Sequence, residues 1–225
     1  MFRFVLTTVT VMFLVLAVAL IAATPPPPGI PADTDPAAYK GLSKDEIARM
    51  KAGEVIIIKN IQAGESPSGM IEAAVIFNQN IDKVWALLVD GVADQYEFLP
   101  YLEKSVLSKQ VDNHYFVDFH LVIMGVKLDY RVDHVGEKDK YYFHWQLDPK
   151  YPNKLKVLKG YWRFYWMDEG HTLTRYGTWF EIGIGVPNFV QEFLIKRDLP
   201  QSLNNVKTYI NSGGTWRKPG FKGSK

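Results

Sequence analysis

Apolar and polar residues alternate with a period of two over His114–Ile123 and again over Val126–Val132. The apolar residues stand at odd positions in the first segment and at even positions in the second. A period of two is typical of β-strands that bury one face. The Met124-Gly125 pair between the segments predicts a two-residue turn, so the two strands form an antiparallel hairpin.

This turn decides which residues of the hairpin face each other. On the apolar face, residues 117, 119 and 121 lie opposite residues 132, 130 and 128. On the other face Asp118 meets Arg131 and His120 meets Asp129, and opposite charges across two strands stabilise a sheet. We therefore interpret these four side chains as a solvated sheet face rather than as catalytic groups.

Further strands are indicated by alternating or β-branched segments, with a single helix among them. They are expected at Glu54–Ile61, Met70–Phe77, Tyr141–Leu147, Leu155–Trp166 and His171–Ile182. Residues 90–105 are expected to form a loop that contains a cluster of apolar residues. Runs of strands without a strand–helix–strand rhythm are typical of α+β proteins with an antiparallel sheet.

Two short helices are predicted before the long strand region. Ser43 and Glu46 have the spacing of a capping box, which predicts a helix over Lys44–Lys51. Apolar residues recur at helical spacing in Asn80–Val89 and predict the second helix.

A long helix near the C-terminus carries two apolar stripes that would point in different directions on a straight helix. Pro200 lies between the stripes and has no N–H to donate. We therefore predict a break or kink at Asp198–Pro200, which would let both stripes pack on one curved sheet. The first stripe is Phe189, Val190, Phe193 and Leu194, and the second is Leu199, Leu203, Val206 and Ile210.

The glycines that precede this helix, Gly183 and Gly185, do not predict a nucleotide site. A dinucleotide fingerprint needs a third glycine, where Asn188 stands, and a strand after the helix. We interpret the pair as the turn between the last strand and the helix.

The N-terminal segment Phe4–Ala23 is uncharged and long enough to cross a bilayer. It predicts a transmembrane anchor or a signal peptide. Arg3 precedes the segment, and the next positive charge is Lys40, which favours a cytoplasmic N-terminus and an exported domain. Four consecutive prolines then indicate an extended spacer. We divide the chain into this segment (1–23), a proline-rich linker (24–41), a folded domain (42–212) and a basic flexible tail (213–225).

Composition excludes several kinds of chemistry. The chain has no cysteine, so thiol catalysis, iron–sulfur clusters and cysteine-ligated zinc are excluded. The five histidines show no metal-ligand spacing, and we expect neither a metal nor another cofactor. A net charge of +2 gives a nucleic-acid partner no electrostatic support. We expect a monomer.

Several short motifs lie in one order along the chain: Gly53-Glu54-Val55, Val84-Trp85, Asp90, Tyr96–Pro100, Gly160–Phe164, Thr172–Gly183, Pro187 and Leu199–Leu203. Over roughly residues 53–211 this order resembles the START-like, or SRPBCC, superfamily, which includes polyketide-cyclase-like and coenzyme-Q-binding START-type proteins. The resemblance implies a helix-grip fold, in which a curved antiparallel sheet surrounds the C-terminal helix and encloses a deep apolar cavity. Members bind sterols, phospholipids, quinones or polyketides, and a minority are enzymes.

The inward-facing residues of the predicted strands are rich in aromatic rings. We expect a hydrophobic ligand, of the lipid, sterol or quinone class, in a cavity beside a membrane. The candidate cavity residues are Tyr115, Phe119, Tyr130, Phe143, Trp145, Trp162, Phe164 and Tyr176. The candidate residues of the cavity mouth are Phe98, Leu99, Pro100, Tyr101, Phe189 and Phe193.

Two alternatives remain open. An enzyme of the cyclase, aromatase or hydrolase type would need a general acid or base in the cavity, for which His134, Tyr130 and Tyr176 are the best candidates, whereas Arg163 and Glu181 are expected to face outward. A membrane-tethered interaction domain would instead fill its core with the aromatic rings.

Overall fold

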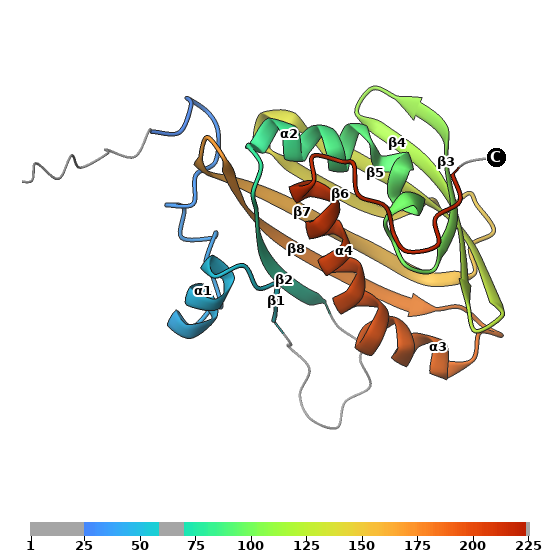
Figure 1. The fold of residues 1–225 in the computed structure, drawn as a ribbon. Coiled ribbons are helices and arrows are strands. Elements are labelled where there is room, and N and C mark those ends of the chain that lie inside the picture. The colour runs from blue at the N-terminus through green and yellow to red at the C-terminus, as the bar shows by residue number, and fades with distance from the viewer. Residues whose placement is uncertain (1–24, 59–69, 224–225) are drawn as a thin grey trace, which may run out of the picture.

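A computed structural model describes residues 25–58 and 70–223, and Figure 1 shows its fold. Eight antiparallel strands form one sheet in the order β1-β2-β8-β7-β6-β5-β4-β3. The strands are β1 (Ile56–Ile58), β2 (Ile71–Phe77), β3 (Leu102–Val111), β4 (His114–Ile123), β5 (Val126–Glu137), β6 (Tyr142–Leu147), β7 (Leu155–Asp168) and β8 (His171–Ile182).

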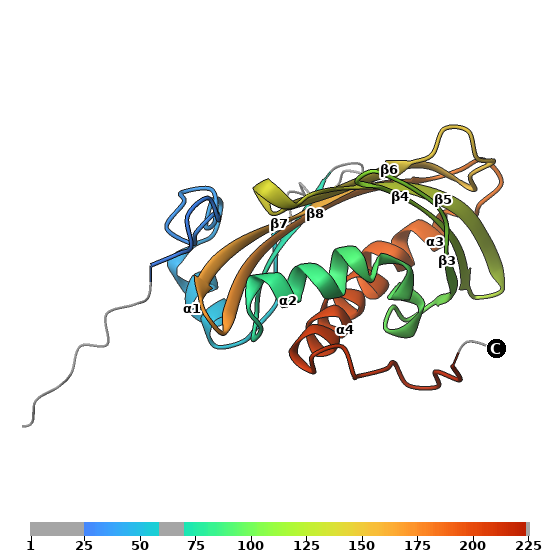
Figure 2. The same ribbon diagram turned by 90° about the horizontal axis from the view of Figure 1, so that it is seen from above.

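The helices that matter for the site lie on the concave side of this sheet (Figure 2). One group follows β2: α2 (Ile81–Trp85), the π-helical turn η1 (Ala86–Asp90) and the 3₁₀ helix η2 (Val92–Glu97). The other group ends the domain: α3 (Asn188–Phe193), the π-helical turn η4 (Leu194–Asp198) and α4 (Leu199–Asn211). The predicted α+β helix-grip fold is confirmed, because the sheet curves around the C-terminal helix.

The predicted register of the β4–β5 hairpin is confirmed at every position. Phe119 pairs with Tyr130, Asp118 with Arg131 and His120 with Asp129. Met124 and Gly125 both have positive φ, 48° and 81°, as a type I′ turn requires. The charged face carries ion pairs, since Arg131 donates to Asp118 and His120 contacts Asp129.

Strand β3 corrects the expectation of a loop through residue 105. It begins at Leu102 and lies at the edge of the sheet, next to β4 alone. Most of its side chains are exposed, among them Val106, Leu107 and Val111. An edge strand with little burial shows no apolar alternation, so the pattern gave no signal for it.

Helix α1 (Lys44–Lys51) and its capping box are confirmed, and both lie on the convex side of the sheet. There Ala38 and Met50 are fully buried in a second, small core of seven buried residues that includes Tyr165 and Leu173. The segment expected to be a linker up to residue 41 also contacts the sheet, because Arg175 donates to the carbonyls of Ala38 and Lys40. Nearer the start of this segment, Trp166 in β7 donates its N–H to the carbonyl of Pro31 and accepts from the N–H of Asp33, so the segment contacts the sheet from residue 31 onward.

The predicted break in the C-terminal helix takes the form of the π-helical turn η4. Buried Leu194 and Leu199 are five residues apart, which an α-helix would place on different faces. A π-helical turn spans five residues and aligns them. The ribbon stays continuous through this region (Figure 1). Val190 of the first stripe and Leu203 of the second are both buried in the core.

The tail differs from the expected solvated terminus in its described part, which ends at residue 223. Lys218 donates through Nζ to the carbonyls of Leu99 and Leu102 and through its N–H to the carbonyl of Glu97. Arg217 pairs with the Glu97 carboxylate at 2.8 Å. These acceptors, between the end of η2 and the start of β3, hold Arg217 and Lys218 on the domain.

Within residues 25–58 and 70–223, no helix combines the length and the apolar character needed to cross a membrane. The predicted span Phe4–Ala23 lies outside the described residues, as do residues 59–61 at the end of the predicted strand Glu54–Ile61.

Candidate ligand-binding cavity

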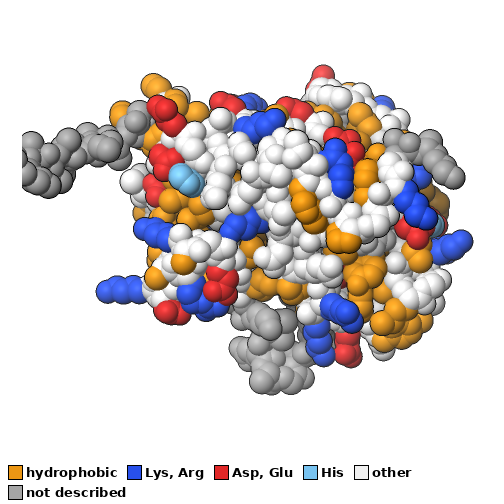
Figure 3. All heavy atoms as spheres, in the orientation of Figure 1, with side chains coloured by type: hydrophobic (Ala, Val, Ile, Leu, Met, Phe, Trp, Pro, Cys, Tyr) orange, Lys and Arg blue, Asp and Glu red, His pale blue; other side chains and the backbone are white. Residues whose placement is uncertain are grey.

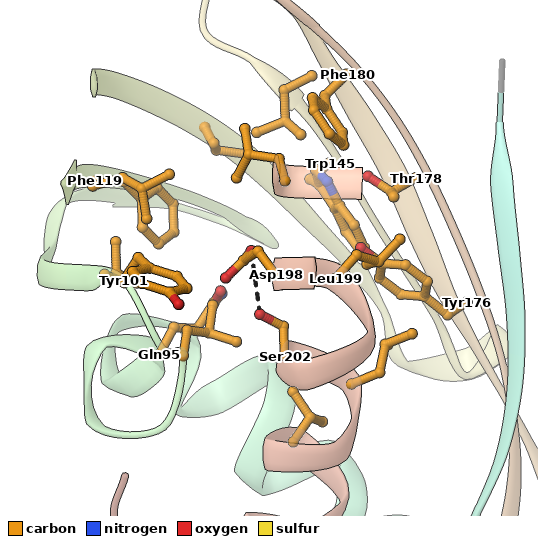
Figure 4. Close-up of a pocket in the computed structure, with 18 of the residues that line it drawn as sticks. Gln95, Tyr101, Phe119, Trp145, Tyr176, Thr178, Phe180, Asp198, Leu199 and Ser202 are labelled. Carbon is orange, nitrogen blue, oxygen red and sulfur yellow. Dashed lines mark hydrogen bonds between the residues drawn. The ribbon is translucent and has the colours of Figure 1, made fainter. Parts of the chain in front are cut away.

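A cavity of about 200 Å³ lies between the concave face of the sheet and the C-terminal helix. Most of its wall is apolar, and the aromatic rings of β4 to β8 form one side (Figure 4). The lining residues are Leu88, Gln95, Phe98, Leu99, Tyr101, Leu102, Phe119, Leu121, Tyr130, Val132, His134, Phe143, Trp145, Leu155, Leu158, Trp162, Tyr176, Thr178, Phe180, Leu194, Asp198, Leu199, Ser202, Leu203 and Val206.

Six of the eight predicted cavity residues line this space: Phe119, Tyr130, Phe143, Trp145, Trp162 and Tyr176. Phe164 does not, because it is fully buried and meets the ring of Trp85 edge-on, with centroids 5.8 Å apart. Tyr115 also lies outside the lining. Phe164 and Tyr115 lie on the inward face of the sheet where α2 and η1 cover it. The apolar alternation of the strands therefore continues beyond the part of the sheet that lines the cavity.

The predicted mouth residues divide in the same way. Phe98, Leu99 and Tyr101 line the cavity, and Pro100 does not. Phe193 packs edge-on against Tyr101, with centroids 5.0 Å apart, outside the lining itself. Phe189 is 48% exposed and takes no part.

A small group of polar residues in the cavity wall was not predicted from the sequence. Figure 4 shows Asp198 pointing toward Gln95 and Tyr101, with Ser202 one helical turn further along. The Ser202 hydroxyl donates to Oδ2 of Asp198 over 3.4 Å, and Oδ1 is buried without a hydrogen-bond partner. The spacing of Leu194, Asp198 and Ser202, four residues each, was the available signal.

The surroundings of Asp198 disfavour its charge. Burial raises the pKa of its carboxyl from 3.8 to about 6, and the Ser202 hydroxyl opposes this only in part. Burial also raises the pKa of Tyr130 and Tyr176, and the nearby charge of Asp198 adds to both shifts. Among the described residues that line the cavity there is no lysine or arginine.

His134 lies in the wall as a neutral ring. Burial lowers its pKa to about 4. Its Nδ1 is 3.3 Å from the carbonyl oxygen of Tyr115, so Nδ1 donates and Nε2 is left as an acceptor. The ring stacks on Phe143 with centroids 5.4 Å apart. Arg163 and Glu181 do not line the cavity, and Glu181 pairs with Lys156 at 2.9 Å.

In the described part of the chain, no group of three or more histidine, aspartate or glutamate side chains has an arrangement that could hold a metal ion.

The position of Trp145 depends on Gly160, its partner across β6 and β7. A Cβ at Gly160 would lie 2.5 Å from the Trp145 ring and would overlap the carbonyl oxygen of Gly177. We expect Gly160→Ala to destabilise the protein by ~1–3 kcal/mol, as overpacking does, measured by urea unfolding. The control is Gly170→Ala, whose Cβ would meet nothing closer than 3.6 Å. Equal stability of the two variants would contradict the prediction.

No family model and no curated protein sequence matches the chain. Among solved structures, an aromatase/cyclase named Zhui from a Streptomyces species superposes with a TM-score of 0.54 at 18% identity, covering 63% of this chain and 93% of that one. A STAR-related lipid transfer protein from Xanthomonas axonopodis gives 0.56 at 15% identity, covering 69% and 98%. A START superfamily protein from Mycobacterium smegmatis gives 0.52 at 9%, covering 64% and 97%. The chain therefore has the fold of the START-like superfamily that its motifs resemble.

Proposed function

We propose that the domain binds a hydrophobic small molecule of the lipid, sterol or quinone class in the cavity, as a carrier or sensor. The observation that carries the proposal is the cavity itself, an apolar and aromatic hollow with a few polar groups in its wall, which is the usual composition of a small-molecule site. The fold neighbours with lipid transfer or aromatase/cyclase in their names support the same class of ligand.

The size of the cavity narrows the class of ligand that it can hold. About 200 Å³ lies below the ~300–1,000 Å³ of typical ligand sites. The cavity as it stands therefore fits a compact ring system or a short chain, and not both chains of a phospholipid. The aromatic rings enclose this space and do not fill it, which supports a binding cavity over a domain with a filled core.

The proposal is tested by what the purified full-length chain carries. We expect organic extraction and mass spectrometry to recover one class of apolar molecule from the protein and to lose it in Leu158→Trp, which fills the cavity. The control is Val157→Trp on the opposite face of β7, which does not line the cavity and should keep the molecule. A protein that is repeatedly empty and takes up no apolar probe would overturn the proposal.

We also propose that the domain works beside a membrane, with the N-terminus in the cytoplasm and the domain exported. The apolar sequence Phe4–Ala23 supports this. So do the hydrophobic side chains that gather over the α3 end in Figure 3, where Ile184 and Phe189 are exposed. Cell fractionation and protease treatment from outside should find the full chain in the membrane fraction with its domain cleavable. A domain protected in intact cells would contradict the orientation.

One observation favours an enzyme as the second candidate. The acceptor Nε2 of His134 and the Asp198 carboxyl both belong to the cavity wall, and burial raises the pKa of Asp198 to about 6, which suits a group that moves a proton near neutral pH. Such an enzyme would act on a polyketide or an ester. Conversion of the bound molecule by the wild type and not by His134→Ala would favour it, and recovery of the molecule unchanged would favour a carrier.

A further inference from the structure

Asp198 is the one ionisable side chain among the described lining residues that can carry a negative charge near neutral pH. It reaches the cavity because η4 turns the helix: Leu194, Asp198 and Ser202 form one row facing inward, and Leu199 and Leu203 form the next. Placing a carboxylate in an apolar wall is unfavourable unless its oxygens accept hydrogen bonds. Its placement therefore needs a compensating partner.

The protein itself satisfies the Asp198 carboxylate only in part. Ser202 donates to Oδ2 over a long 3.4 Å, and Oδ1 is buried with no donor on it. The cations that neutralise carboxylates elsewhere in this chain, such as Arg131 beside Asp118 and Arg217 beside Glu97, have no counterpart in the cavity wall. The site thus offers an acceptor that faces the space a ligand would fill (Figure 4).

We infer that this part of the cavity wall selects ligands by a hydrogen-bond donor, such as an alcohol, a phenol or an amine, which binds the Asp198 carboxylate, and that it rejects ligands whose polar end is a carboxylate. A donor on the ligand binds the Asp198 carboxylate, which accepts only the long hydrogen bond from Ser202 within the protein. A ligand carboxylate finds no cation there and faces a like charge. None of the remaining polar groups of the wall carries a positive charge, so they do not change the sign of this preference. These groups are Gln95, Tyr101, Tyr130, His134, Trp145, Tyr176, Thr178 and Ser202. This inference rests on the proposed function and names the chemistry of its ligand.

The test uses four probes with one ring system and different polar ends: naphthalene, 2-naphthol, 2-methoxynaphthalene and 2-naphthoate. The full-length chain is placed in lipid nanodiscs, and each probe is titrated by calorimetry at about pH 7.5 with empty nanodiscs as the blank. We expect 2-naphthol to bind about tenfold or more tightly than 2-methoxynaphthalene, as a hydrogen bond to a charged group implies, and 2-naphthoate to bind weakest.

Two variants distinguish the effect of the hydrogen-bond acceptor at Asp198 from the effect of its negative charge. Asp198→Leu removes both and should erase the preference for 2-naphthol over 2-methoxynaphthalene, while naphthalene binds at least as well as before. Asp198→Asn keeps an acceptor and removes the charge, so 2-naphthoate should gain relative to 2-naphthol. The control is Asp148→Asn, a buried carboxylate outside the cavity, which should leave all four affinities in their wild-type order.

The outcomes distinguish this inference from the proposed function. If all four probes bind equally well, or if Asp198→Leu leaves the ratio of naphthol to methoxynaphthalene unchanged, the inference is overturned and the binding function stands. If 2-naphthoate binds tightest to the wild type, the inference is likewise overturned. If no probe binds to a chain that unfolds cooperatively, both the inference and the proposed function for ligands of this size are overturned.

Discussion

Asp198→Asn is expected to stabilise the ligand-free protein at pH 7 and to leave its stability nearly unchanged at pH 4. The folded state raises the carboxyl pKa from 3.8 to about 6, so it binds the proton more tightly than the unfolded chain does. Stability therefore falls as pH rises through this window, and it is regained in the variant. A shift of this size corresponds to at most about 3 kcal/mol at neutral pH.

The measurement is urea unfolding of both proteins across this pH range, followed by far-ultraviolet circular dichroism. His134 acts in the opposite direction, since its pKa falls from 6.5 to about 4 and the fold loses stability as pH drops through that window. Its contribution is shared by both proteins and cancels in their difference. A difference that is the same at pH 4 and pH 7 would show that Asp198 is not protonated more readily in the folded state.

The second large expected effect is on the free energy of unfolding, which should fall more when a packed aromatic residue is removed than when one that faces the cavity is removed. Phe164→Ala is expected to cost ~3–5 kcal/mol, because the ring is fully buried between other side chains and its loss leaves a new void. Phe180→Ala should cost only ~1 kcal/mol, because one side of that ring already faces empty space.

Chemical unfolding of the two variants checks this, and probe binding provides the second readout. Phe164→Ala should keep the affinity for naphthalene under native conditions, and Phe180→Ala should change it. Equal costs for the two substitutions would mean that the wall near Phe180 is as tightly packed as the core, which would contradict a ligand-sized hollow there.

The hairpin of β4 and β5 could be predicted to the residue because three local signals agreed. The turn dipeptide, the apolar alternation and two cross-strand charge pairs all require the same register, and the pairing of Asp118 with Arg131 follows it. Strand β3 gave none of these signals. Strand β3 is held in the sheet by its backbone pairing with β4, while most of its own side chains stay exposed.

The aromatic wall was predictable, but its hollow part was not. Alternation assigns Phe164 and Phe119 to the same inward face, and only the packing of α2 and η1 decides that the first is covered and the second lines a cavity. Asp198 was missed for a related reason. The π-helical turn rotates the following residues, and the position of a polar residue relative to the two stripes depends on that turn.

Residues 213–223 form a strap against the cavity wall, and we expect this strap to control the rate at which a ligand enters and leaves. Its Lys218 binds the carbonyls on both sides of the wall segment that carries Leu99 and Tyr101. If ligand passes this wall, exchange requires detaching the strap, which is a local unfolding event rather than a breathing motion of the sheet. The residence time of the ligand would then be set by the C-terminal tail, and hydrogen exchange at the Lys218 amide, bonded to the Glu97 carbonyl, would follow the same rate.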